Sequence, residues 1–263
     1  MLRIWQLEDQ NMRKGKFGKN AYEQGSHSDC CTGEVVAKWH DNGKAFGAAK
    51  YYDEPIQGCA KDCFFIAALK AIAYKANNTL TSTGSTFSFL NTETMQNESI
   101  SLANKKLAYT ATDKLVYARN AKTDNRWPML YEKAYALWFD QLDAGKCWDA
   151  VDPTQPDIKC IFNGGGNGIT AMMNISRYRT KFEKQPIAFS GNTVMYPTVA
   201  ATRDIDPTQL RLPDQLTRKH TYSIYRKDST YYYLIDPCNN SEKRVALAYL
   251  TTNKFDTWGY VRP

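Results

Sequence analysis

The chain has 263 residues, of which 43% are hydrophobic and 23% charged, as in ordinary folded globular proteins. Aromatic residues make up 13% of the chain, and this content excludes a largely disordered protein. No apolar run approaches the roughly 20 residues of a membrane-spanning helix, so we expect no membrane span. A net charge of +7 is too small to indicate nucleic-acid binding by itself, and we expect no nucleic-acid partner.

Residues 1–50 are polar and rich in Gly, Lys and Asn, with few regularly spaced apolar positions. This composition predicts a segment that packs on the core or leads into it. The first residues lack the long apolar stretch of a secretory signal. A cytoplasmic protein and a secreted protein whose signal has been removed both fit the sequence, and the oligomeric state is not readable from it.

The first strong element is a helix predicted over Cys63–Ala76, rich in Ala and Leu and apolar almost all round, which is typical of a buried helix. Asp62 precedes it and is a good N-cap residue. Cys63 is then the first helical residue, where the helix dipole favours the nucleophilic thiolate. The alternative is an inert buried cysteine, which is common at helix starts.

The rest of the chain divides into a helix-rich and a strand-rich part. Residues 99–120 read as strands, a second helix follows Pro128, and prolines and glycines mark loops between about 153 and 168. Beyond about residue 183 the pattern favours strands, at Ile187–Phe189, Val194–Tyr196, Thr221–Tyr225 and Thr230–Ile235. The sequence therefore predicts an α+β fold with a helical lobe over about 51–182 and a β lobe over about 183–263.

The chain contains seven cysteines, so at least one is unpaired within the monomer. If Cys63 is the free one, six remain, enough for three disulfides whose pairing the sequence does not give. The alternative is seven reduced thiols.

His220 and Asp236 stand at the open ends of two predicted strands. If Lys227–Ser229 form a three-residue hairpin loop, His220 lies directly opposite Asp236 on the same face, with Cβ atoms roughly 5 Å apart. The carboxylate would then orient the imidazole towards a nucleophile. A two-residue loop would place the two side chains on opposite faces. The alternative is a histidine with a chance acidic neighbour.

The order Cys, His, Asp with a wide Cys-to-His separation is typical of papain-like proteases. Within it, Gln57-Gly-Cys-Ala-Lys-Asp-Cys-Phe-Phe-Ile-Ala-Ala68 resembles the calpain-family signature Gln-Gly-x-x-Gly-Asp-Cys-Trp-x-x-Ala-Ala. Further segments resemble the family in the same order: Trp127–Ala136, the Gly-rich Gly164–Ala171, His220–Ile224 and Leu234–Pro237. The resemblance covers roughly residues 50 to 262.

The resemblance implies a papain-like two-lobed catalytic domain over residues 51–263 that acts on protein or peptide substrates. It implies Cys63 as nucleophile, His220 as general base and acid, Asp236 as the residue that orients the imidazole, and Gln57 as an oxyanion-hole donor. Calcium aligns the two lobes in that family, so the resemblance also brings calcium into consideration. The scattered acidic residues do not place a site for it.

Four positions depart from the family pattern. Asp236 stands where the family usually has Asn, Phe64 where it has the Trp after the cysteine, and Cys238 where a Trp shields the histidine pair from water. Lys219 replaces the Gly before the histidine, at a position along the substrate backbone.

The rim of the substrate site is expected to include Gly164, Gly165 and Gly166, because glycine permits a close approach of backbones. The resemblance adds Phe64 and Lys219 to this rim. A plain helix-capping loop is the alternative reading of the glycines. We hypothesise a cysteine endopeptidase. The alternatives are a transglutaminase or glutamine deamidase with the same Cys, His, Asp set, and an inactive relative that only docks peptide.

Overall fold

The computed structural model describes the backbone of residues 36–41 and residues 50–103, 106–110, 116–122, 125–142, 147, 155, 157–162, 165–203, 216–251 and 255–263. Most of the predicted polar segment 1–50, including its predicted packing on the core, lies outside these residues. Within the described ranges no helix has both the length and the apolar content that a membrane crossing requires.

The N-terminal part combines helices with short sheets, and both predicted helices are confirmed. The helices are α2 (Cys63–Lys75), α3 (Trp127–Leu142), α4 (Ile158–Ile161) and α5 (Gly168–Ser176), with a 3-10 turn at Asn77–Thr79. Three antiparallel sheets accompany them: β1 (Val36–Asp41) with β6 (Lys106–Thr110), β2 (Pro55–Ile56) with β7 (Arg119–Asn120), and β3 (Ser82–Thr83) with β4 (Thr86–Asn91) and β5 (Gln96–Ser101).

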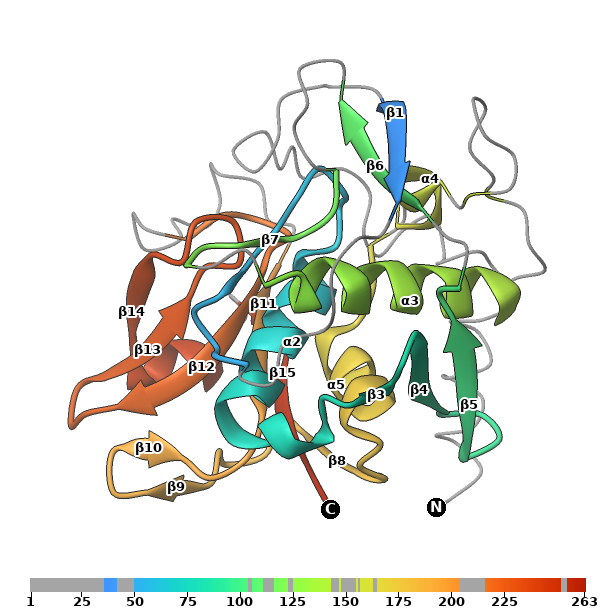
Figure 1. The fold of residues 1–263 in the computed structure, drawn as a ribbon. Coiled ribbons are helices and arrows are strands. Elements are labelled where there is room, and N and C mark those ends of the chain that lie inside the picture. The colour runs from blue at the N-terminus through green and yellow to red at the C-terminus, as the bar shows by residue number, and fades with distance from the viewer. Residues whose placement is uncertain are drawn as a thin grey trace.

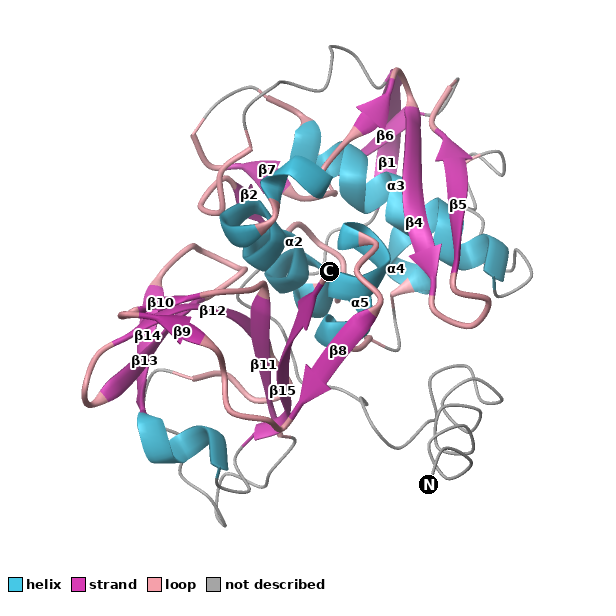
Figure 2. Ribbon diagram, turned by 90° about the horizontal axis from the view of Figure 1, so that it is seen from below, coloured by secondary structure: helices cyan, strands magenta, loops and turns pink. Residues whose placement is uncertain are grey.

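The C-terminal part is one antiparallel sheet with the strand order β14-β13-β12-β11-β15-β8, in which β10 also pairs with β12 and β9 pairs with β10. Its strands are β8 (Thr180–Glu183), β9 (Phe189–Ser190), β10 (Thr193–Val194), β11 (Thr198–Thr202), β12 (Thr221–Lys227), β13 (Tyr231–Ile235), β14 (Glu242–Ala246) and β15 (Phe255–Arg262), with a 3-10 turn at Leu247–Thr251. The mixed helix and strand content agrees with the predicted α+β class. Figure 2 shows helices α2–α5 on one side and β9, β10 and β12–β14 on the other, with β11, β15 and β8 between them.

Two apolar cores lie under these elements. The larger one gathers the helices and includes Phe65, whose ring stacks on Tyr135 at 4.5 Å, while the smaller one lies on the sheet around Tyr222 and Leu234. Helix α2 packs against α5 and also against β12 and β11, and it occupies the centre of Figure 1. Residues 63 to 73 of α2 are all buried. This explains why the helix is apolar all round.

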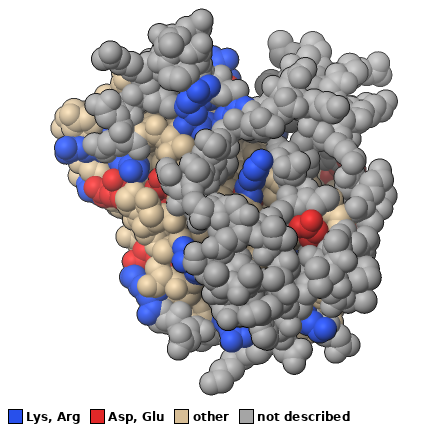
Figure 3. Space-filling view, turned by 90° about the horizontal axis from the view of Figure 1, so that it is seen from above, with Lys and Arg blue, Asp and Glu red and all other residues tan. Residues whose placement is uncertain are grey.

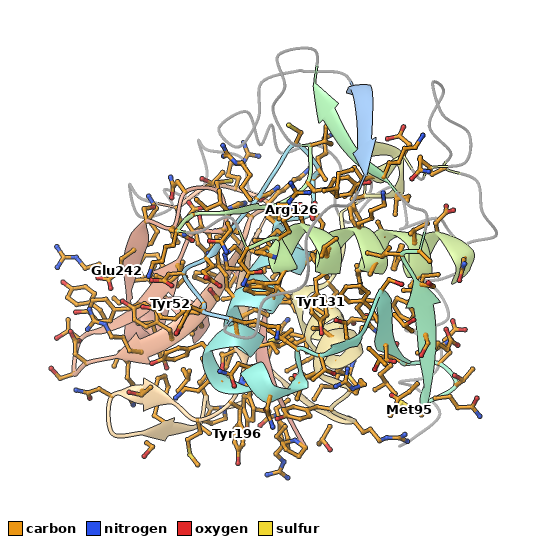
Figure 4. All side chains as sticks on the ribbon, in the orientation of Figure 1. Tyr52, Met95, Arg126, Tyr131, Tyr196 and Glu242 are labelled. Carbon is orange, nitrogen blue, oxygen red and sulfur yellow. The ribbon has the colours of Figure 1, made fainter. Side chains whose placement is uncertain are left out.

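Aromatic side chains also bridge the segment before α2 to the sheet. Tyr52 stacks on Tyr225 of β12 at 6.0 Å and meets Tyr74 of α2 edge-on at 5.0 Å. Figure 4 labels Tyr52 between α2 and the strands. On the face drawn in Figure 3, the charged side chains of the described residues mix both signs.

The predicted register of the β12–β13 hairpin is wrong. Ser223 pairs with Ile235, a bulge follows Ile224, and Lys227 pairs with Tyr232. The loop is longer than predicted because Asp228 Oδ1 accepts hydrogen bonds from the two backbone N–H groups of residues 230 and 231, each at 2.7 Å. His220 is therefore displaced by two residues from the position directly opposite Asp236. A shift of two keeps both side chains on one face.

Candidate active site

Cys63 is the first residue of α2 and the free cysteine of the described part of the chain. The carbonyl of Asp62 accepts from Phe65 N–H at 2.8 Å and Ile66 N–H at 3.0 Å, which starts the helix. The exposed fraction of Cys63 is 6%. The side chain of Cys63 therefore lies at the N-terminus of α2, where the helix was predicted to begin.

Asp62 occupies the predicted N-cap position, but its side chain makes no capping hydrogen bond. The carboxyl is fully buried next to Glu132 of α3. Burial raises the pKa of Asp62 to about 7, and burial together with the charge of Asp62 raises the pKa of Glu132 well above its usual range. Glu132 therefore keeps its proton at neutral pH, directly beside the residue that precedes the nucleophile.

His220 stands just before β12, and β11 fixes its backbone. Its N–H donates to Thr202 Oγ1 at 3.0 Å, and its carbonyl accepts from Thr202 N–H at 2.9 Å. Its ring meets Tyr222 edge-on at 4.8 Å. The exposed fraction of His220 is 1%, so the ring position is fixed by its neighbours.

The His220 ring lies between Asp236 and Cys63. Nε2 is 2.9 Å from Asp236 Oδ1, and Cys63 lies close enough for its charge to act on the ring. Burial alone would lower the pKa of His220, but the charge of Cys63 and the hydrogen bonds to Asp236 and Cys63 outweigh it and raise the pKa to about 9. The ring therefore carries a proton at neutral pH, and a protonated imidazole beside a cysteine favours the reactive thiolate.

Asp236 begins a tight turn after β13. Its N–H donates to Ser241 O and its carbonyl accepts from Asn240 N–H, each at 3.0 Å. Burial would raise the pKa of Asp236, but the hydrogen bond and charge of His220 outweigh it and lower the pKa. Asp236 is therefore ionised, and since a carboxylate only accepts, His220 Nε2 donates to it.

Lys70 of α2 is a residue that sequence reasoning missed. It is fully buried, and its Nζ donates to Asn240 Oδ1 in the turn and to Tyr52 O at 3.3 Å. Burial lowers the pKa of Lys70 to about 7, against the opposing charges of Asp53 and Asp236. A lysine within an otherwise apolar helix was the available signal.

Gln57 lies at the junction between the segment before α2 and the Asp236 turn. Its backbone N–H donates to Pro237 O at 2.8 Å, and its buried side chain donates from Nε2 to Ala60 O at 2.7 Å. An amide nitrogen carries two N–H groups, so a second donor remains for a ligand. Its predicted role in an oxyanion hole stays a prediction.

The predicted substrate rim divides into supporting and surface positions. Phe64 is only 3% exposed and packs edge-on against Phe162 at 5.8 Å, and a Cβ on Gly166 would lie 2.5 Å from the Phe64 ring. Phe64 therefore supports the loop from beneath. Gly165 is half-buried with φ +70°, while Gly164 lies outside the described residues.

Two further features flank that rim. Asn167 caps α5, because its Oδ1 accepts from Ile169 N–H at 2.8 Å and Thr170 N–H at 3.1 Å, which agrees with the helix-capping alternative. Lys219 is half-buried with φ +48°, in the left-handed region that favours glycine. The strained backbone explains why a glycine would suit this position.

The cysteines agree with the oxidised alternative. Among the four cysteine side chains described, Cys59, Cys147 and Cys238 are disulfide-bonded and Cys63 is free.

One cluster in the described part of the chain brings three metal-capable side chains within 4.8 Å of one another: His220, Asp236 and Cys238. The disulfide removes the thiolate that Cys238 would supply. Calcium takes six to eight oxygen ligands, and this set offers a single carboxylate. These three residues do not fit the calcium ion that the resemblance brings into consideration.

Comparison with known proteins gives a family match. Residues 45–247 match the family model described as calpain family cysteine protease. No curated protein sequence matches the chain.

Proposed function

Because the chain belongs to the calpain family of cysteine proteases, we propose that it is an endopeptidase that cleaves peptide bonds through a thioester on Cys63. The observation that carries the proposal is the position of the His220 ring, which bonds to Asp236 and lies close enough to Cys63 for the charge of the sulfur to raise the pKa of the imidazole. The two apolar cores, one under the helices and one under the sheet, fit a papain-like arrangement in which each lobe supplies part of the site.

In the first step, Cys63 sulfur attacks the substrate carbonyl carbon and forms a tetrahedral intermediate. Its oxygen becomes negative, and the proposed donors to it are the backbone N–H of Cys63 and the remaining N–H of the Gln57 side chain. One such donor is typically worth about 3 kcal/mol in the transition state.

His220 then gives its proton to the leaving amine, and the C–N bond breaks to leave a thioester. In the second step His220 takes a proton from water, the hydroxide attacks the thioester, and the sulfur leaves as thiolate. Asp236 keeps Nε2 protonated throughout, so the other ring nitrogen serves Cys63 and the substrate.

The test uses a fluorogenic peptide and a thiol-directed epoxide. Cys63→Ala should abolish hydrolysis and epoxide labelling, and mass spectrometry should place the label of the natural protein on Cys63. Because Cys63 is buried, labelling also reports whether a ligand reaches the sulfur. Labelling of another cysteine with undiminished hydrolysis in Cys63→Ala would refute the proposal.

A second function is favoured by one observation: the residue that orients His220 is the carboxylate of Asp236. Transglutaminases and glutamine deamidases also use a Cys, His, Asp set and a thioester. Release of ammonia from a glutamine-containing peptide, without a new peptide terminus, would assign the chain to this second function.

A further inference from the structure

Cys238 lies against three residues of the candidate site, Asp236, His220 and Gln57. Its backbone N–H donates to Asp236 Oδ1 at 2.9 Å, the same oxygen that faces His220 Nε2. Its sulfur is 4.0 Å from His220 Nε2 and 3.7 Å from Gln57 Oε1. A single residue thus contacts the orienting carboxylate, the imidazole and the proposed oxyanion donor.

The chemistry of this sulfur is fixed by its disulfide bond. A disulfide sulfur has no S–H to donate and no thiolate to attack a substrate, bind a metal or compete for the proton of His220. It presents an apolar, polarisable surface. At contact distance from Nε2 such a surface excludes water from the His220–Asp236 hydrogen bond, and a charged hydrogen bond is stronger where water is excluded.

The turn that carries Cys238 is also tied to the segment before α2 and to α2 itself. The turn is held by hydrogen bonds at Gln57 N–H to Pro237 O and at Lys70 Nζ to Asn240 Oδ1. Both bonds attach it to the segment that carries Cys63. Cys238 follows Pro237, so its disulfide bond adds a covalent link in the part of the turn closest to the imidazole.

We propose that the disulfide-bonded Cys238 is a positioning residue: its sulfur shields the His220–Asp236 pair and seats Gln57, so the site is competent only when Cys238 is oxidised and Cys63 is reduced. This inference rests on the proposed function for its effect on rate. It predicts an enzyme suited to compartments where disulfides persist.

The proposal gives an unusual response to reductants. A dithiol such as dithiothreitol reduces the Cys238 disulfide by two electrons, giving two protein thiols and the cyclic disulfide of the reagent. Low concentrations restore a Cys63 thiol that has been oxidised and raise activity. Higher concentrations open the Cys238 disulfide and lower activity.

The test compares Cys238→Ala with Cys147→Ser. Both variants break one disulfide and leave one new thiol, but Cys147 packs against the helical core, its N–H donating to Asp140 Oδ1 at 3.3 Å. Cys238→Ala should lower kcat at least about tenfold with little change in KM, because small displacements of catalytic groups have large effects on rate. Cys147→Ser should leave kcat within about twofold, as expected for a change outside the site.

A spectroscopic readout separates positioning from a general loss of structure. The Nε2 proton of His220 should give a downfield NMR resonance in the natural protein, since the sulfur shields it from exchange with water. The titratable groups that face this ring in the described structure are Cys63, Asp236 and Tyr222. Cys238→Ala should lose the resonance while its far-ultraviolet circular dichroism stays unchanged.

If Cys238→Ala does not fold, stepwise reduction of the natural protein replaces it. Mass mapping of alkylated cysteines then gives the order in which disulfides open, and activity should fall in step with Cys238. An unchanged kcat and resonance in Cys238→Ala, or full activity after the Cys238 disulfide has opened, overturns the inference and leaves the protease assignment intact. Loss of the resonance in a protein that never cleaves peptide supports the positioning and refutes the protease assignment.

Discussion

The helix that carries Cys63 and the strands that carry His220 are held in place by different forces. Helix α2 is surrounded by apolar and aromatic side chains, and its position follows from packing. His220 and Asp236 depend instead on a few hydrogen bonds, from Thr202, Cys238 and the Asn240 turn that Lys70 anchors. Substitutions on the helical side should therefore mainly lower the free energy of unfolding. Substitutions on the sheet side should mainly change kcat and the pKa of His220.

Phe65→Ala should give the largest effect. Its ring is fully buried, stacks on Tyr135, and faces Phe162 at 6.5 Å. Truncating a buried Phe typically lowers the free energy of unfolding by about 3–5 kcal/mol. Urea unfolding measures it. A loss below about 1 kcal/mol would contradict the claim that packing holds this side.

Asp236→Ala should have the second-largest effect, a fall in kcat of about 10²-fold, because the imidazole loses its orienting acceptor. Asp236→Asn is the matched variant, since its amide oxygen still accepts from Nε2–H, and it should lose far less.

The same pair of variants tests the charge of Asp236. In the natural protein His220 keeps its proton until the pH rises through its raised pKa of about 9, so kcat/KM should decline on that alkaline side. Asp236→Asn removes one charge that raises this pKa, and the decline should move to lower pH. An unmoved profile would show that Asp236 does not act on His220.

Much of this arrangement was readable from the sequence, and its failures have physical causes. Helix α2 begins at Cys63 as predicted because its apolar pattern is continuous. The predicted register of the β12–β13 hairpin was wrong because it assumed a three-residue loop and no bulge. The structure has a bulge after Ile224 and a longer turn stabilised by hydrogen bonds to Asp228. His220 and Asp236 still meet, since an even shift preserves the face.

Other features depend on contacts between distant segments, which a single sequence does not encode locally. The pairing of β11 with β15 and of β15 with β8 joins strands that lie far apart in the chain, with other strands of the sheet between them. The hydrogen bond from Lys70 Nζ to Asn240 Oδ1 joins residues that are 170 positions apart in the sequence. The side chain of Asp62 was expected to cap α2, but it turns towards Glu132 in the interior, a contact visible only in three dimensions.

Thr202→Val should have a smaller effect than the variants of Phe65 and Asp236. It removes the hydroxyl that accepts from His220 N–H and donates to Thr217 O at 2.6 Å. The expected loss is about 1–2 kcal/mol of unfolding free energy, with a fall in kcat. Thr198→Val on the same strand removes a hydroxyl bonded to Tyr196 O, away from His220, and should lower stability while sparing kcat. Equal kcat values in the two variants would show that the hydrogen bond between Thr202 and His220 does not position the imidazole.

Asp62→Asn should give the smallest effect, a change in the slope of stability against pH. The folded-state pKa of Asp62 is raised to about 7 from 3.8, so its contribution is fully present below 3.8 and is lost as the pH rises through about 7. The amide cannot ionise, so the slope between these limits should flatten. Chemical denaturation at a series of pH values measures it, and an unchanged slope would mean that Asp62 is not buried as described.

The most direct measurement is an NMR titration of the imidazole side chains, which is feasible because the chain has only three histidines, His27, His40 and His220. His220→Asn assigns the signal. The resonance of His220 should titrate near pH 9 in the natural protein and at a lower pH in Cys63→Ala, which removes the charge and hydrogen bond of the sulfur. A His220 signal that titrates near 6.5 and does not respond to Cys63→Ala would contradict the contact between nucleophile and base on which the whole assignment depends.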